Sequence, residues 1–144
     1  MIPAHPNYFL MAGGVLSGLA ALLHLAVIAG GPDWYRLFGA GERMAHMAAQ
    51  GSLRPVFITL VIVAVLAIWA AYAFSGAGIL PRLPLLRTAL VLISAIYLLR
   101  GCLLFAMLLF RPQMVNAFWV WSSLIVFVYG LAYAIGTAIA WPDL

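Results

Sequence analysis

Four apolar stretches divide this chain, and each is long enough to cross a membrane. They lie at about residues 8–29, 55–74, 85–110 and 115–141. A hydrocarbon core takes about 20 residues of α-helix, because each residue adds about 1.5 Å along the axis. Glycine, proline and arginine separate the stretches, and these residues commonly mark helix ends. The sequence therefore predicts an all-α fold, an integral membrane four-helix transmembrane bundle that forms one domain over residues 1–144.

The composition supports this class and excludes others. Of the 144 residues, 67% are hydrophobic and 7% are charged, whereas about 25% of the residues in a soluble domain are charged. The seven cations are all arginine and stand singly between apolar runs, so they form no patch for nucleic acid. A single cysteine excludes an intramolecular disulfide and a multi-cysteine metal site. The enzyme signatures HExxH, GxSxG and the P-loop are missing from the sequence, and we expect neither a metal nor a cofactor.

Short connections make sequential helices antiparallel, so we expect an up-down-up-down bundle. Both termini then lie on one side of the membrane, and the first and third loops lie on the other. The first-loop side carries four arginines and the side of the termini carries two, namely Arg36, Arg43, Arg54 and Arg111 against Arg82 and Arg87. Because arginine is enriched in cytoplasmic loops, we predict that the long first loop is cytoplasmic.

The first loop is too long for a simple turn, because helix links in bundles usually take about 2–8 residues. Apolar side chains recur in it at i, i+3 and i+4: Trp34, Leu37 and Phe38. This pattern predicts an interfacial amphipathic helix at about residues 33–48, interrupted near Gly39 and Gly41. Two interpretations are open: an anchor on the lipid head groups, or a lid or re-entrant segment over a cavity.

The third apolar stretch contains a charge, Arg100, in the middle of a run from Leu83 to Phe110. Its guanidinium keeps its proton, and an arginine at the centre of a bilayer costs about 2.5–3.5 kcal/mol on insertion scales. A group inside the protein must therefore receive this charge. One interpretation is a structural ion pair with Glu42 or Asp33, and the other is a ligand site.

Depth along the helices places a second polar group near Arg100. Arg100 lies about 16 Å and His24 about 9 Å from the predicted cytoplasmic ends of their helices. Hydroxyl and aromatic side chains follow at helical spacing, which predicts a partly polar intramembrane pocket. The predicted ligand-binding residues are Arg100, His24, Tyr97, Trp34, Trp119 and Ser122. Arg100 would hold a polar head group, His24 would share a hydrogen bond, and the aromatic rings would form apolar walls.

Three functions fit these sequence features, and the first two use the predicted pocket. The first, which we favour, is binding or transport of a small amphipathic ligand that is anionic or carbonyl-bearing. The second is a small membrane enzyme that uses His24 as general acid or base on a lipophilic substrate. The third is an accessory subunit of a larger membrane complex, because small residues such as Gly14 and Gly18 allow close contact with a helix of a partner subunit or of a second copy. Close contact within the bundle explains these glycines at least as well. The expected partners are membrane lipid, the ligand and such a subunit, and not nucleic acid.

Short motifs on two of the predicted helices resemble a known family. The segment HLAVIAGG at His24–Gly31, followed by Trp34 and by YLLRG at Tyr97–Gly101, resembles a family of small bacterial four-helix inner-membrane proteins of unknown function. The resemblance implies the same four-helix topology in a bacterial inner membrane, and it implies no activity. With the first loop cytoplasmic, as the arginine count predicts, both termini would be periplasmic. Size and layout also look like the emopamil-binding sterol isomerase group, whose mechanism depends on intramembrane acidic residues. No acid lies within the four predicted spans, so we carry over no isomerase role.

Overall fold

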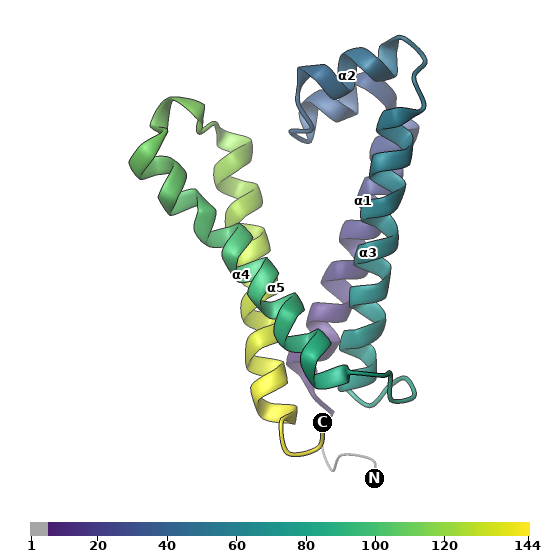
Figure 1. The fold of residues 1–144 in the computed structure, drawn as a ribbon, viewed down its shortest axis with the longest axis vertical. Coiled ribbons are helices and arrows are strands. Elements are labelled where there is room, and N and C mark those ends of the chain that lie inside the picture. The colour runs from purple at the N-terminus through teal and green to yellow at the C-terminus, as the bar shows by residue number, and fades with distance from the viewer. Residues whose placement is uncertain (1–5) are drawn as a thin grey trace. The chain divides into compact units, whose positions relative to one another are not determined.

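The structure of the chain is a computed structural model that describes residues 6–144, drawn as a ribbon in Figure 1. The described part consists of helices and their connections, in the order α1 Tyr8–Leu37, α2 Glu42–Ala49, α3 Arg54–Gly76, α4 Leu86–Phe110, the 3-10 helix η1 Pro112–Met114 and α5 Ala117–Ala140. Four of these helices, α1, α3, α4 and α5, are long and apolar enough to cross a membrane. The prediction of an all-α chain with four membrane-length helices is therefore confirmed.

The helix boundaries agree closely with the predicted spans, except at the end of α1. Helices α3, α4 and α5 begin and end within two residues of the prediction. Helix α1 continues to Leu37, but its backbone leaves the helical conformation at Gly31, with φ 69° and ψ −151°. Only glycine adopts such a conformation readily, and Pro32 then begins a new turn because its ring fits the start of a helix. The sequence signal at this point therefore marks a break in the helix and not the end of helical structure.

Packing divides the chain into two units. The terminal unit comprises the residues up to Ser17 together with Trp69–Leu144, and the loop unit comprises Gly18–Ile68. The terminal unit thus holds the start of α1, the end of α3, and the whole of α4 and α5. The loop unit holds the rest of α1, all of α2 and the start of α3.

Helices α4 and α5 pack closely in the terminal unit and lie side by side in Figure 1. A Cβ atom added at Gly101 would lie 2.8 Å from the Cα atom of Phe127, and one added at Gly130 would lie 2.8 Å from the amide nitrogen of Leu98. Position 101 faces 127 while position 98 faces 130, so the two helices run antiparallel. Glycine at both contacts lets the two backbones approach each other.

The start of α1 packs against α5 and against the end of α3 in the same way. The side-chain amide of Asn7 donates a 2.7 Å hydrogen bond to the carbonyl of Gly136. A Cβ atom at Gly136 would lie 2.8 Å from the amide nitrogen of Leu10, and one at Gly14 would lie 2.8 Å from the ring of Phe74. Gly14 is therefore used for contact within the chain. At Gly18, the other member of the predicted pair, the added Cβ has no heavy atom within 4 Å among residues 6–144, apart from its chain neighbours and the backbone of its own helix.

A chain of hydroxyl groups joins these helices inside the terminal unit. Ser17 Oγ lies 2.9 Å from the hydroxyl of Tyr97 and 2.9 Å from the hydroxyl of Tyr133. The Tyr133 hydroxyl donates a 3.0 Å hydrogen bond to the carbonyl of Trp69. Because that carbonyl accepts only, the donors run in one direction, from Tyr97 to Ser17, from Ser17 to Tyr133, and from Tyr133 to Trp69. All three hydroxyl protons are thereby used.

The loop unit is organised around Tyr35, whose side chain is 2% exposed. It packs with the buried residues Val27 and Ala45, and the partly buried Phe38, Met44 and Ala48 lie against this cluster. Thr59 Oγ1 donates to the carbonyl of Pro55 at 2.8 Å, so the Tyr35 hydroxyl donates to Thr59 at 3.3 Å. The cluster holds the end of α1 against α2 and the start of α3.

The predicted break in the first loop is present. Gly39 and Gly41 have φ values of 73° and 92°, in the region that favours glycine. They separate the end of α1 from α2, which lies at the end of the predicted range of 33–48. The placement of α2 at a membrane interface stays a prediction.

Candidate functional site

Arg100 lies ten residues before the end of α4, well inside the membrane-length part of that helix. One guanidinium nitrogen, Nη1, donates a 3.0 Å hydrogen bond to Ser123 Oγ on α5. The guanidinium carbon lies 4.9 Å from the centre of the Trp119 ring, in a cation–π contact. Ser123 is 1% exposed, so the charge is held at the edge of the buried α4–α5 contact by a neutral hydroxyl and an aromatic face.

The Arg100 side chain extends along the helix pair toward the link between α4 and α5. The contacts of Gly101 and Gly130 place the Cα atom of Arg100 at the level of position 128 on α5. Ser123 lies five residues closer to the start of α5, which is about 7 Å along the axis. The long apolar stem therefore carries the charge toward the nearer helix end, as arginine commonly does in membranes.

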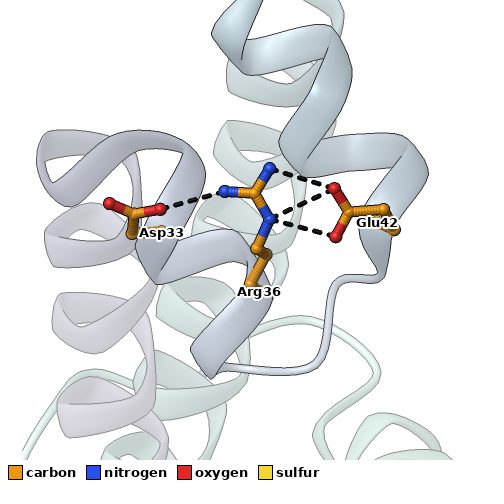
Figure 2. Close-up of polar contacts among 3 residues, drawn as sticks. All are labelled: Asp33, Arg36 and Glu42. Carbon is orange, nitrogen blue, oxygen red and sulfur yellow. Dashed lines mark hydrogen bonds and ion pairs between the residues drawn. The ribbon is translucent and has the colours of Figure 1, made fainter.

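The carboxylates predicted as partners of Arg100 bind another arginine, Arg36. Figure 2 shows Arg36 between the two acids, and its Nη1 donates to Asp33 at 2.9 Å. Its Nε and Nη2 donate to the carboxylate of Glu42, with the shortest contact at 2.9 Å. The ion pairs found among residues 6–144 are all made by Arg36. The i, i+3 spacing of Asp33 and Arg36 was the sequence signal for this pairing.

This cluster of three charges is exposed. The side chains of Arg36, Asp33 and Glu42 are 43%, 90% and 71% exposed. The hydrogen bonds from Arg36 are the main cause that lowers the pKa of Glu42 below its ordinary value. Exposed ion pairs contribute little to stability, so the cluster orients the turn between α1 and α2 without holding it alone.

His24 and Trp34, two of the predicted site residues, belong to the loop unit. Nδ1 of His24 lies 2.7 Å from the carbonyl of Ala20, one turn earlier in α1. A carbonyl only accepts, so Nδ1 carries the proton, and in the neutral ring Nε2 is left as the acceptor. Trp34 is exposed, and its ring centre lies 5.6 Å from that of Phe38. Since Arg100 belongs to the terminal unit, the pocket predicted to join it with His24 stays a prediction.

Tyr97 and Ser122 make contacts within the helix bundle. The ring of Tyr97 packs edge-on against that of Trp69 with 4.8 Å between centres, and its hydroxyl donates to Ser17. Ser122 Oγ donates to the carbonyl of Trp119, at 3.3 Å, in its own helix. The Tyr97 contact connects two helices, and the Ser122 contact is a hydrogen bond to the backbone of its own helix. Neither residue makes a hydrogen bond with Arg100.

Ser123 is the contact residue of Arg100 that the sequence prediction missed. It repeats at intervals of seven with two other buried residues of α5, Gly130 and Thr137. Such a repeat places the three on one helix face, and small or hydroxyl side chains at this interval indicate the face that packs against a neighbour. The residue predicted to bind the ligand was Ser122, which lies on the adjacent helix face.

The arrangement at Arg100 suits the binding of an anion. A permanent cation with a hydroxyl and an aromatic ring offers hydrogen-bond donors and apolar surface, and it offers no group that would transfer a proton at neutral pH. Two grooves in the terminal unit lie along α4, and neither is lined by the predicted site residues. Comparison of the chain with protein-family models, with curated proteins and with solved structures finds no match.

Proposed function

We propose that this protein binds the anionic head group of a small amphipathic molecule at Arg100, inside the membrane. The observation that supports this function is the set of neutral partners around a fixed charge. Among residues 6–144, the polar and aromatic partners of the guanidinium are Ser123 and Trp119. A guanidinium has five N–H donors, so the bond to Ser123 leaves most of them for a ligand. A desolvated cation without a counter-charge is unfavourable, and an anionic ligand would supply that charge.

The local helix geometry favours an anion over a neutral carbonyl group. Trp119 is in the first turn of α5, and its amide is already capped by the side chain of Asn116. The start of a helix carries a partial positive charge, which adds to the positive charge of Arg100. Negative charge is stabilised at such a place, and the same field disfavours any second cation.

The surroundings of Arg100 favour a ligand with an apolar tail. Leu99 and Leu103, its neighbours on α4, are 67% and 49% exposed. These side chains would contact lipid or the hydrocarbon part of a ligand. With the predicted orientation, the head group would lie in the cytoplasmic half of the membrane. The proposal thus narrows the predicted ligand class to anionic amphiphiles that bind in that half.

A titration with a fatty-acid carboxylate tests the proposal. Dodecanoate and uncharged dodecanol are added separately to the full chain in a maltoside detergent, and tryptophan fluorescence is recorded. Trp119 lies 4.9 Å from the guanidinium, so ligand binding there should change its emission. We expect saturable binding of dodecanoate, weakened about tenfold or more in Arg100→Gln, because a hydrogen bond to a charged group contributes about 1.5–3 kcal/mol.

Arg111→Gln is the matched control, because it removes an exposed arginine just after the same helix. It should bind dodecanoate as the wild type does. Circular dichroism of each variant checks that the helices are intact. Equal binding of dodecanoate by wild type and Arg100→Gln, or equal binding of dodecanol and dodecanoate by the wild type, would contradict the proposal.

A further inference from the structure

The far end of the α4–α5 pair, away from Ser123, carries two adjoining grooves. The first, the arginine groove, has a volume of about 540 Å³, and its lining includes Arg82, Leu86, Arg87 and Thr88. The second, the apolar groove, has a volume of about 460 Å³ and is lined by Val91, Ser94, Ala134, Thr137, Ala138 and Trp141. The guanidinium carbon of Arg87 lies 5.2 Å from the centre of the Trp141 ring. This arginine–tryptophan contact joins the two grooves.

The arginine groove contains two guanidinium groups, and both keep free hydrogen-bond donors. Arg82 donates to main-chain oxygens of Asp143 and Leu144, and Arg87 donates to the backbone carbonyl of Trp141 at 3.1 Å. These bonds join both guanidinium groups to main-chain oxygens after α5, and the partner of Arg87 is a neutral carbonyl. Because a guanidinium has five N–H donors, both arginines retain donors beyond these bonds. The nearby acid, Asp143, is exposed, and it makes no ion pair among the described residues.

The first turn of α4 adds backbone donors to the same groove. Leu85, which precedes the helix, gives it no side-chain cap. Leu86, Arg87 and Thr88 are the first three residues of α4 and line the arginine groove. Amide groups at an uncapped helix start are free to bind an anion. Two arginines and a helix start therefore favour a phosphate group in this place.

The apolar groove contains an unsatisfied hydroxyl, that of Thr137. Its side chain is 5% exposed, and its Oγ1 is buried with no hydrogen-bond partner among the described residues. A buried polar atom without a partner is unfavourable. The other hydroxyl in the groove, Ser94, donates to the carbonyl of Leu90 at 2.7 Å. Thr137 lies four residues before Trp141, about 6 Å further along the helix, on the hydrocarbon side of the arginines.

We propose that the two grooves together bind one anionic phospholipid. Its phosphate would contact Arg82, Arg87 and the first turn of α4. An ester carbonyl, which lies on the hydrocarbon side of the phosphate, would accept the hydrogen bond from Thr137. An acyl chain would then lie against the alanines and Val91 of the apolar groove. This site is independent of Arg100 and of the ligand proposed there.

Native mass spectrometry of the full chain in a maltoside detergent tests this site. Dioleoyl phosphatidylglycerol and dioleoyl phosphatidylcholine are titrated separately, because they share acyl chains and differ in net charge. We expect the wild type to bind phosphatidylglycerol about tenfold or more tightly than phosphatidylcholine. The double variant Arg82→Gln/Arg87→Gln should lose that preference, whereas Arg111→Gln and Arg100→Gln should keep it. A double variant that keeps the preference would overturn the proposal.

Thr137→Val separates the lipid contact from the folding of the protein. The substitution keeps the shape of the side chain and removes the unpaired hydroxyl, so the variant should be at least as stable as the wild type. It should bind both lipids several-fold more weakly, because both carry ester carbonyls. Unchanged affinity for both would overturn the proposal. Inorganic phosphate is added as a competitor, and displacement of the lipid by phosphate at equal concentration would show that the site takes a free anion instead.

Discussion

The two units of the molecule satisfy their polar groups in opposite ways. In the loop unit, three charged side chains form ion pairs at an exposed turn, where Arg36 binds both Asp33 and Glu42. In the terminal unit, neutral hydroxyls satisfy one another inside the bundle, and Arg100 has only neutral partners among the described residues. The difference indicates that acids in this chain are placed where water reaches them. We therefore propose a ligand as the counter-charge of Arg100.

The largest expected effect on stability comes from widening the close contact between α4 and α5 in the terminal unit. Gly101→Ala places a methyl group 2.8 Å from the backbone of Phe127, so α4 and α5 must move apart. Overpacking of this kind typically costs about 1–3 kcal/mol. Unfolding in mixed micelles with increasing dodecyl sulfate, followed by circular dichroism, would measure the loss.

Gly18→Ala is the matched control, at the edge of the loop unit. Beyond its own stretch of helix, the added methyl group meets no described heavy atom within 4 Å, and alanine has the higher helix propensity. We expect stability equal to that of the wild type or slightly above it. If Gly18→Ala lowered the stability as much as Gly101→Ala does, the close contact between α4 and α5 would not explain the loss in Gly101→Ala.

A smaller difference is expected between two hydroxyl deletions, one in each unit. Ser17→Ala leaves the buried hydroxyl of Tyr97 without an acceptor, and hydrogen bonds between membrane helices contribute about 0.6–1.7 kcal/mol. Tyr35→Phe removes one 3.3 Å bond but leaves Thr59 bonded to Pro55. Ser17→Ala should therefore destabilise the protein more than Tyr35→Phe in the same unfolding measurement, and the reverse order would contradict the larger contribution assigned to the hydroxyl chain.

The smallest effect is expected at the exposed ion pairs of the loop unit. Because the pKa of Glu42 is lowered by Arg36, the contact stabilises the fold fully above the ordinary carboxyl pKa of about 4.5. That contribution disappears as the pH falls through the lower pKa of the folded state. We expect Glu42→Gln to unfold as the wild type does at neutral pH, since exposed pairs contribute little.

A carbon-13 NMR titration of the Glu42 carboxyl group checks the cause of this shift. In Arg36→Gln its pKa should rise toward the ordinary value. An unchanged pKa would show that Arg36 does not bind Glu42 in solution.

The helices of this fold were predictable from local sequence, and the partners of the charged residues were not. Runs of apolar residues ended by glycine and proline determine where α3, α4 and α5 begin and end. The partner of Arg100 depends on the relative height of α4 and α5, which the contacts at Gly101 and Gly130 determine. Adjacent residues, Ser122 and Ser123, differ by 100° around the helix, and only packing decides which of them faces Arg100. The pairing of Arg36 with Asp33 was accessible from spacing, whereas its bond to Glu42 requires the turn at Gly39 and Gly41.

Ser17 has a consequence for how freely α1 can slide. It is the only serine or threonine in the 30 residues of α1, and its hydroxyl serves two phenols at once. A shift of one helical turn, about 5.4 Å, would take it away from both phenols and bring no replacement. The first ten residues of α1 therefore have one favoured height against α4 and α5, and piston-like motion of this segment is disfavoured.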